Sequence, residues 1–243
     1  MNAIEIRNLS KSFRGLYAVD HLNMTVPVGA IYGFVGENGS GKSTTEKLIC
    51  GHLVPDSGAI QLFGKDYTDA GVRVRVGALI ENAGCFPGSS VWDNLMIQAI
   101  NLDLDNPVNE SQRVLRIVRM DDSAKIKFKS CALGMKQRIG IAMALLGDPA
   151  LLILDEPING LDTDGMRIMR EILVDITQKL GCTVLISSHI LGELEKIATH
   201  YGILCQGKMI QEITAKEMDS RAQVLVSSKT KDMAGAERIL TAK

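Results

Sequence analysis

Residues 36–43 read Gly36-Glu37-Asn38-Gly39-Ser40-Gly41-Lys42-Ser43. They satisfy the pattern G-x-x-x-x-G-K-[ST], and they lie between a short apolar run, residues 31–35, and a helical segment that begins near Ser43. Glycines let a backbone curl around a phosphate with its N–H groups pointing inward, while the positive end of the following helix faces the same anion. The stretch predicts a nucleotide-binding loop in which Lys42 reaches the β and γ phosphates, Ser43 ligates Mg²⁺ and Thr44 also contacts the nucleotide.

Two more apolar runs share the character of residues 31–35, namely residues 151–154 and 184–186. None of the three alternates with polar residues, which is typical of parallel strands buried on both faces. The second run ends in Asp155-Glu156-Pro157 and the third in Ser187-Ser188-His189. Because ligands bind at the carboxyl ends of strands in an open α/β sheet, we expect all three strand ends to form one site.

The acidic pair and the histidine have separate expected roles. Neighbouring carboxylates repel each other unless a cation or a difference in function separates them. We therefore expect Asp155 to help hold Mg²⁺ and Glu156 to orient or deprotonate a water that attacks the γ phosphate. His189 is expected to bind the γ phosphate or the same water. Glu156 and His189 are thus the candidate catalytic residues.

Composition excludes several other classes of protein. Among 243 residues, Lys and Arg number 27 and Asp and Glu 28, so no basic field favours nucleic acid as a partner. The longest apolar stretch, residues 139–147, falls short of the roughly 18 residues needed to span a bilayer. Charges among the first residues argue against a secretory signal and favour the cytoplasm. Five cysteines without a CxxC pair are expected to be reduced thiols.

Changes of pattern along the chain indicate how it is organised. Residues 3–9, 24–28 and 59–63 predict an antiparallel sheet beside the parallel one. Helical periodicity at residues 91–102 and 112–120, separated by an expected loop at 103–110, predicts a helical subdomain inserted at about residues 82–147. The main domain is expected to cover residues 1–215. Residues 216–243 read as a short C-terminal appendage with a possible strand at 223–226 and a terminal helix.

These elements in this order resemble the ATP-binding cassette of ABC transporters, over about residues 4–212. The Walker A loop of the family matches residues 36–43, its Walker B strand and catalytic glutamate match 151–156, and its D-loop matches 159–162, which ends in Asp162. Its switch histidine matches His189, and its adenine-stacking aromatic falls on Phe13, with Tyr17 as the alternative. The resemblance implies a P-loop NTPase fold of ABC type: an α/β core with a parallel sheet, an antiparallel β subdomain and an inserted helical subdomain.

Two positions depart from the pattern of the family. The segment 134–138 sits where the family has the end of its signature motif, but Ala132 stands two residues before Gly134 in place of the usual serine. A hydroxyl contact to the γ phosphate is therefore missing, and the Gly134 N–H with the helix N-terminus remains. Ser130 could substitute only if the local backbone shifted. We predict a weakened signature half-site.

The second departure is Glu81, where most of the family has the Q-loop glutamine. A carboxylate carries a full negative charge, so it should bind Mg²⁺ more strongly and repel an unneutralised γ phosphate. This glutamate resembles the E-loop of the subgroup that expels bacitracin and lantibiotics. The alternative interpretation is a solvated loop acid without a coupling role.

The resemblance implies a function through partners. Two cassettes would face each other head to tail with ATP between the Walker A of one and the signature of the other, on the inner face of the cell membrane, bound to an integral-membrane permease. Antimicrobial-peptide export is the preferred interpretation. The alternatives are another transported substrate, a soluble ABC ATPase acting on ribosomes or DNA, and a P-loop kinase or GTPase outside the family. No nucleic-acid partner is expected under the preferred interpretation.

Overall fold

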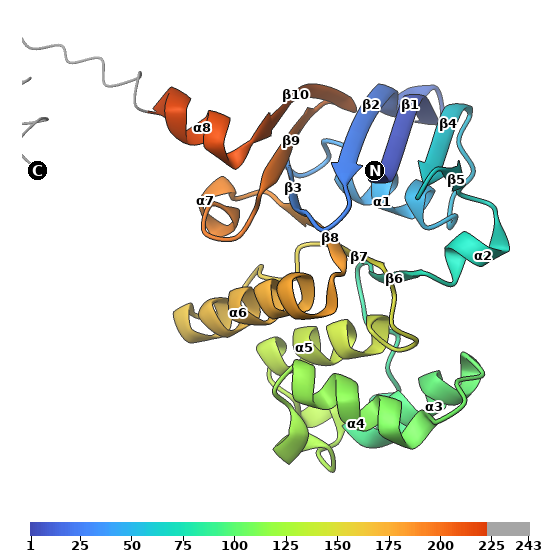
Figure 1. Ribbon diagram of the computed structural model, residues 1–243, viewed down its shortest axis with the longest axis vertical. Helices are drawn as coiled ribbons and strands as arrows, with labels where there is room; N and C mark the ends of the chain where they lie inside the picture. The colour runs from blue at the N-terminus through green and yellow to red at the C-terminus, as the bar shows by residue number, and fades with distance from the viewer. Residues whose placement is uncertain (223–243) are drawn as a thin grey trace, which may run out of the picture.

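The computed structural model describes residues 1–222. Strands gather in the upper half of the molecule and helices in the lower half (Figure 1). The strand expected at residues 223–226 and the terminal helix lie outside the described residues. Residues 215–222 form helix α8 (Ala215–Ala222) directly after the last strand.

A six-stranded sheet forms the centre of the described chain. Its order is β10 (Lys208–Thr214), β9 (His200–Cys205), β3 (Ile31–Val35), β8 (Thr183–Ser188), β7 (Leu151–Leu154) and β6 (Val76–Leu79). Neighbouring strands from β9 to β6 are parallel, and β10 pairs antiparallel with β9. The three strands expected from uninterrupted apolar runs are therefore confirmed. They are adjacent to one another, and every residue of β7 and β8 is buried.

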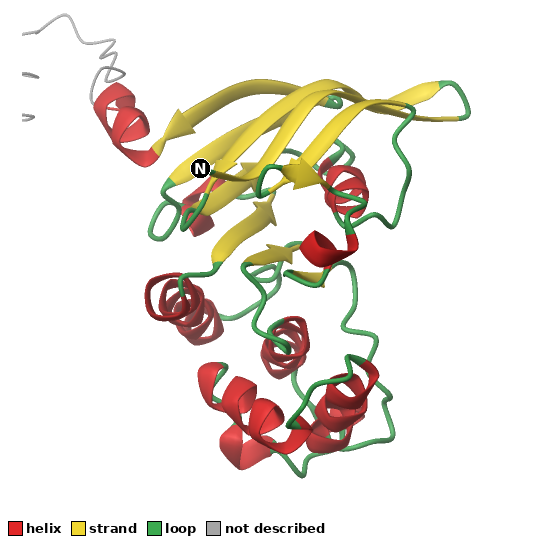
Figure 2. Cartoon of the chain, turned by 45° about the vertical axis from the view of Figure 1, so that its right-hand side comes forward, coloured by secondary structure: helices red, strands yellow, loops and turns green. Residues whose placement is uncertain are grey.

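A second, four-stranded antiparallel sheet covers one face of the first (Figure 2). Its order is β2 (Leu16–Pro27), β1 (Asn2–Phe13), β4 (Ser57–Leu62) and β5 (Lys65–Asp66). The three antiparallel strands predicted from alternation are confirmed. The first two are longer than expected because they continue into a hairpin whose Phe13 pairs with Leu16.

Alternate residues of the central strands enter two separate cores, since successive side chains of a strand point to opposite faces. Leu151 and Ile153 of β7 pack with the antiparallel sheet and helix α1 (Lys42–Ile49). Leu152 and Leu154 pack with the helices of the lower half. The P-loop NTPase class with two kinds of sheet and added helices is confirmed.

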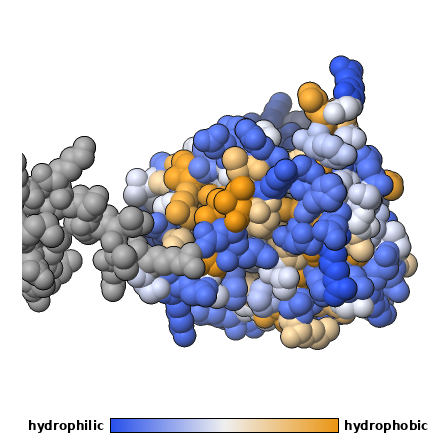
Figure 3. Space-filling view, turned by 90° about the horizontal axis from the view of Figure 1, so that it is seen from above, coloured by the Kyte–Doolittle hydropathy of each residue, from blue (hydrophilic) through white to orange (hydrophobic). Residues whose placement is uncertain are grey.

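Seen from above, the molecule presents a mostly hydrophilic face with smaller apolar patches (Figure 3).

The lower half consists mainly of helices. They are α3 (Val91–Asn101), α4 (Pro107–Ile117), η1 (Asp121–Ser123), η2 (Phe128–Ser130), α5 (Leu133–Ala144) and α6 (Thr163–Leu180), with α2 (Ala70–Arg73) and α7 (Leu191–Leu194) elsewhere. In the part of the chain that the structure describes, no helix is both long enough and apolar enough to cross a bilayer.

One predicted boundary is wrong. Residues 103–110 were expected to form a loop, but α4 begins at Pro107. The Asn106 side chain accepts a hydrogen bond from the Asn109 N–H at 3.2 Å, so it caps the helix, and Pro107 occupies the first helical position, where its missing N–H costs nothing. Asn and Pro, which are common in loops, here begin a helix.

Candidate functional site

The strand register brings the predicted site residues to one edge of the sheet. Val35 lies beside Ser188, Ile186 beside Leu154, and Leu154 beside Leu79. The loop after β3, the acidic pair after β7, the polar end of β8 and the segment after β6 therefore leave the sheet side by side. This arrangement is the one that the three apolar runs predicted.

The glycine-rich loop is held tightly against two other elements. A Cβ on Gly36 would lie 2.5 Å from the Leu204 carbonyl oxygen, and one on Gly41 would lie 2.3 Å from that of Ala18. Gly41 also has a φ of 108°, a conformation that side chains disfavour. No side chain caps α1, so its first N–H groups remain available to an anion. The loop therefore fits a phosphate group.

Lys42 lies inside this loop, with its side chain only 5% exposed. Its Nζ donates hydrogen bonds to the carbonyl oxygens of Gly36 at 2.7 Å and Glu37 at 3.1 Å. The same ammonium lies 3.7 Å from Glu156 Oε1. Phosphate oxygens are charged acceptors and would bind this ammonium more strongly than neutral carbonyls do.

Ser187, which the sequence analysis did not single out, links the ends of β7 and β8. Its hydroxyl donates to Asp155 Oδ1 at 2.9 Å and accepts from the Glu156 N–H at 3.1 Å. Ser187 is fully buried, so both bonds are shielded from water. The signal in the sequence was the position of Ser187 at the end of an apolar run, two residues before His189. Ser43 and the fixed Asp155 offer the hydroxyl and carboxylate oxygens that Mg²⁺ prefers, so the residues present fit that ion.

Glu156 and His189 are in direct contact. The His189 Nδ1–H donates to Glu156 Oε2 at 2.7 Å, and Asn159 Nδ2 donates to the same oxygen at 3.1 Å. Glu156 has a φ of 46°, in the left-handed region. Two donors and a bent backbone hold the carboxylate at the mouth of the site with Oε1 directed toward Lys42.

Glu81 is at the same edge, but its carboxylate forms an ion pair across the loop. It lies 2.5 Å from Lys47 Nζ of α1, and its side chain is 63% exposed. Its φ is 62°. No hydrogen bond among the described residues joins it to Asp155 or Ser43. The structure thus places Glu81 beside the predicted metal ligands without bringing it into contact with them.

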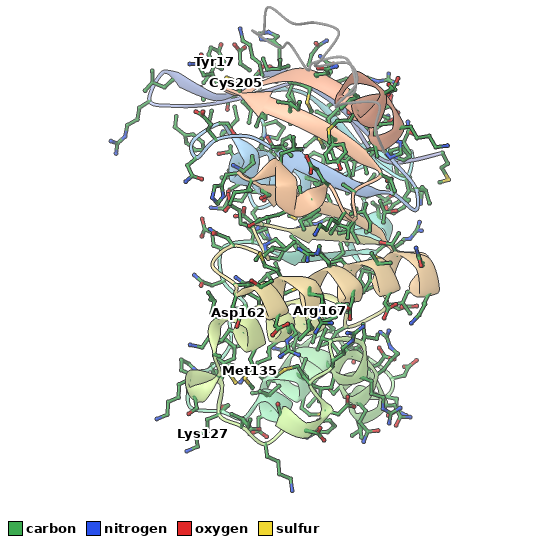
Figure 4. The ribbon with its side chains drawn as sticks, turned by 90° about the vertical axis from the view of Figure 1, so that its left-hand side faces the viewer. Tyr17, Lys127, Met135, Asp162, Arg167 and Cys205 are labelled. Carbon is green, nitrogen blue, oxygen red and sulfur yellow. The ribbon has the colours of Figure 1, made fainter. Side chains whose placement is uncertain are left out.

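Ala132 and Gly134 stand at the start of α5, away from the phosphate-binding loop. Ala132 is the N-cap residue, and no side chain caps this helix. Together with Asp162 they line a surface hollow of about 440 Å³. Asp162 itself caps α6, where its Oδ1 accepts from the Gly165 N–H at 2.7 Å. Figure 4 shows Asp162 and Met135 in the lower half of the molecule, well below Tyr17.

The two candidate adenine-stacking aromatics lie in the hairpin between β1 and β2. Phe13 is 46% exposed, with Lys11 Nζ 5.7 Å from the centre of its ring, and Tyr17 is 60% exposed. Ala18, the neighbour of Tyr17, contacts the phosphate-binding loop at Gly41. Both rings are free to stack, and Tyr17 is closer along the chain to the loop.

Comparison with known proteins shows to which family the chain belongs. Residues 19–159 match the protein-family model for ABC transporters. The chain belongs to the ABC transporter family. As a member it binds ATP and hydrolyses it, and the preceding geometry is that of an ABC cassette.

Relatives and a solved structure agree with this assignment. The cassette is 40% identical over 222 residues to the bacitracin transport ATP-binding protein BcrA of Bacillus licheniformis, covering 90% of this chain and 72% of that protein. It is 38% identical over 218 residues to the lantibiotic transport ATP-binding protein SrtF of Streptococcus pyogenes, covering 89% and 91%. Its fold matches cbiO1 of Clostridium perfringens, part of an ABC transporter complex, with a TM-score of 0.82, 27% identity and 92% of each chain covered.

Proposed function

We propose that this cassette drives the export of antimicrobial peptides, of the bacitracin or lantibiotic type, through a separate permease on the inner face of the cell membrane. Two relatives named for bacitracin and lantibiotic transport support the substrate class. Glu81, at the position of the Q-loop, supports the same subgroup. Hydrolysis of Mg·ATP supplies the energy, a second cassette is the cytoplasmic partner, and no nucleic acid is required.

Residues of the main domain, 1–215, bind the nucleotide. Lys42 exchanges its two backbone carbonyl partners for the β and γ phosphates, while N–H groups of the loop and of the first turn of α1 surround them. Ser43 and Asp155 would hold Mg²⁺, which neutralises charge on the phosphates. Phe13 or Tyr17 stacks on the adenine.

Hydrolysis depends on Glu156 and its donors. Glu156 accepts a proton from, or orients, the water that attacks the γ phosphate. His189 and Asn159 keep one oxygen of this carboxylate engaged, so that the other faces Lys42 and the phosphates. With Nδ1 as the donor, a neutral His189 also presents Nε2 as an acceptor.

A second cassette completes each site. Ala132, Gly134 and Asp162 line a hollow on the surface and form no described hydrogen bond with the phosphate-binding loop of their own chain. In a head-to-tail pair, this surface of one cassette covers the ATP of the other. ATP then contacts more protein in the closed pair than in the open one, which biases closure until hydrolysis removes the γ phosphate. The inserted helical region, about residues 82–147, passes this motion to the permease.

The observation that carries the hydrolysis mechanism is the 3.7 Å approach of Lys42 Nζ to Glu156 Oε1, because it brings the phosphate-binding and catalytic groups together. Glu156→Gln keeps the shape of the side chain and removes the base. It should form a stable dimer with saturating Mg·ATP, measured by light scattering on a sizing column. The double variant with Lys42→Ala should remain monomeric. A Glu156→Gln protein that stays monomeric at saturating ATP contradicts the mechanism.

Substrate class needs a test in cells. The chain is expressed with its permease, and the minimum inhibitory concentrations of bacitracin, a lantibiotic and an unrelated antibiotic are compared with those for Lys42→Ala. Protection against a peptide antibiotic that depends on Lys42 supports the proposal. Equal sensitivity of both strains assigns another substrate. Recovery of the chain with ribosomes or DNA, rather than with a membrane protein, would point to a non-transport ATPase.

A further inference from the structure

The hollow that faces a second cassette under the proposed function is built from two helices that are distant in the sequence. Its lining comes from the N-terminal halves of α5 and α6 and from the segment before α6, and it includes Arg138. In Figure 4, Asp162 and Arg167 of α6 lie just above Met135 of α5. Such a surface keeps its shape only while the two helices keep their relative position, so the contacts that join them matter to it.

The end of α4 joins these two helices. The Arg138 guanidinium of α5 donates to the carbonyl oxygens of Arg119 at 3.0 Å and Val118 at 3.4 Å, which directly follow α4. The Arg119 side chain in turn donates to Glu171 of α6 at 2.5 Å and lies 3.5 Å from Asp175 of the same helix. Hydrogen bonds and ion pairs therefore run from α5 through the end of α4 to α6.

Arg119 occupies a backbone position that favours glycine. Its φ is 57°. Its N–H donates to the Arg116 carbonyl oxygen at 3.0 Å, and the Met120 N–H donates to that of Leu115 at 2.9 Å. These two bonds are those of a Schellman motif, in which the residue after the C-cap is left-handed and is usually glycine. An arginine at this position is disfavoured by its own backbone, which indicates that its guanidinium has a role of its own.

The two acids on α6 also have cationic partners within their own helix. Arg167 Nη1 donates to Glu171 Oε1 at 2.8 Å, and Lys179 Nζ lies 2.9 Å from Asp175 Oδ1. These cations would remain beside the acids if Arg119 moved away, so neither carboxylate would be left without a partner. All five side chains are about one-third exposed or more, so water can replace the lost bonds. The link from α4 to α6 can therefore open and close at low cost.

We propose that Arg119 is a positioning residue that fastens α5 to α6, so that the first turns of both helices meet the nucleotide of the facing cassette together. The inference rests on the proposed head-to-tail pairing, and it adds a residue outside the nucleotide site that determines how tightly two cassettes bind each other. No ion pair or hydrogen bond among the described residues joins Arg119 to Lys42, Glu156 or His189. The affinity of a single cassette for ATP should therefore not depend on Arg119, whereas pairing should.

The test uses the full chain carrying Glu156→Gln at saturating Mg·ATP, and measures by light scattering the protein concentration at which half of the chains are paired. Adding Arg119→Gly should raise this concentration roughly 2-fold to 30-fold, the range typical of residues that couple two sites. Because glycine suits the left-handed backbone, Tm should stay near that of the parent. The affinity for a fluorescent ATP analogue, measured below the pairing concentration, should also be unchanged. Arg119→Lys keeps the charge and should recover part of the pairing.

Lys179→Ala is the matched control, because Lys179 pairs with the same Asp175 but only within α6. It should pair like the Glu156→Gln background. Replacing both acids, with Glu171→Gln and Asp175→Asn, should weaken pairing as Arg119→Gly does. Adding Arg119→Gly to that double variant should then cause little further loss, because the three groups act through the same contact.

Four results would overturn the proposal: pairing of Arg119→Gly equal to the background, an equal loss in Lys179→Ala, losses from Arg119→Gly and the acid substitutions that simply add, or a weaker affinity of unpaired Arg119→Gly for the ATP analogue. If Glu156→Gln alone does not pair, the proposed function fails, and hydrogen exchange of the nucleotide-free chain decides the link. There Arg119→Gly should speed exchange of the α5 amides and Lys179→Ala should not. Unchanged exchange in Arg119→Gly contradicts the link.

Discussion

The imidazole of His189 donates its Nδ1–H to Oε2 of Glu156 at 2.7 Å, across 33 residues of sequence. This bond joins the end of β8 to the segment after β7. It leaves Oε1 of Glu156 facing Lys42. The candidate base is thus held through Oε2, to which Asn159 also donates, on the side away from Lys42.

Replacing His189 tests this arrangement. His189→Ala removes the donor, and we expect steady-state ATPase to fall by roughly 10²-fold to 10⁴-fold, the usual range for loss of acid–base assistance. His189→Gln keeps an N–H donor and should recover part of the activity. ATP binding, measured by equilibrium titration, should remain in both. If His189→Ala hydrolyses ATP at the parent rate, the bond has no catalytic role.

Ser187 should matter to stability and to metal binding together. Ser187→Ala leaves Asp155 without its donor and the Glu156 N–H without its acceptor. Because both are shielded, the free energy of unfolding should fall by about 1–3 kcal/mol. Mg²⁺ dependence of ATPase should shift to higher concentration.

Ser188→Ala is the matched control for this prediction. Ser188 is also buried, but the acceptors within reach of its hydroxyl are the Ile190 carbonyl oxygen at 3.2 Å and Glu193 Oε2 at 3.2 Å rather than the metal ligand Asp155. It should lose stability and keep the Mg²⁺ dependence of the parent. A shift of equal size in both variants would mean that Ser187 acts only by packing.

Ala132 leaves α5 without a side-chain cap. Ala132→Ser should add a hydrogen bond from the first helical turn and stabilise the protein by about 1 kcal/mol, seen in denaturant unfolding. It should also raise the ATPase rate of the assembled transporter, because the hydroxyl can reach the γ phosphate of the facing cassette. Ala132→Val supplies no hydroxyl and should do neither. An unchanged rate in the Ser variant contradicts the weakened half-site.

The ion pair of Glu81 and Lys47 is exposed, so breaking it should change stability by no more than about 1 kcal/mol. If Glu81 helps to hold Mg²⁺ in the working site, Glu81→Gln should raise the Mg²⁺ concentration that gives half-maximal ATPase. Lys47→Ala frees the carboxylate and should lower it. Equal Mg²⁺ dependence in all three proteins would favour a solvated acid without a coupling role.

Asp56 should make stability depend on pH. Its carboxylate accepts from Lys11 Nζ at 2.7 Å and from the Ser12 N–H at 2.7 Å, and these bonds lower the pKa of Asp56 to about 2. Stability from this group is present above the unfolded pKa of about 3.9 and is lost as the pH falls toward 2. Asp56→Asn should therefore lower Tm at pH 7, and the difference from the parent should disappear near pH 2.

The exposed Asp122→Asn is a matched control, with little effect expected at either pH. A Tm difference for Asp56→Asn that is the same at pH 7 and pH 2 would mean that the charge of Asp56 does not contribute.

Much of this site could be predicted because each motif follows directly on a strand. An uninterrupted apolar run fixes where a buried strand ends, and the parallel sheet then brings Lys42, Asp155 and His189 together. The start of α4 was missed because Asn106 and Pro107 are common both in loops and at helix N-termini, and only the cap bond distinguishes the two.

Contacts between distant parts of the chain could not be predicted. Lys47 forms an ion pair with Glu81, which is 34 residues away in the sequence, and no pattern in either segment indicates this contact. Glu46 lies in a stretch of polar residues, 42–47, and nothing in that stretch marks it as buried. Its burial depends on which face of α1 packs against the sheet, and the structure shows that this is the face that carries Thr45, Leu48 and Ile49.

Glu81 and Glu156 both adopt left-handed backbone, with φ of 62° and 46°. That conformation costs a residue with a side chain roughly 1–2 kcal/mol, whereas glycine adopts it freely. A search for thermostable variants should therefore favour glycine at position 156, and such proteins would gain stability while losing the carboxylate on which the proposed hydrolysis depends. At position 81 the same change would also remove the exposed ion pair with Lys47.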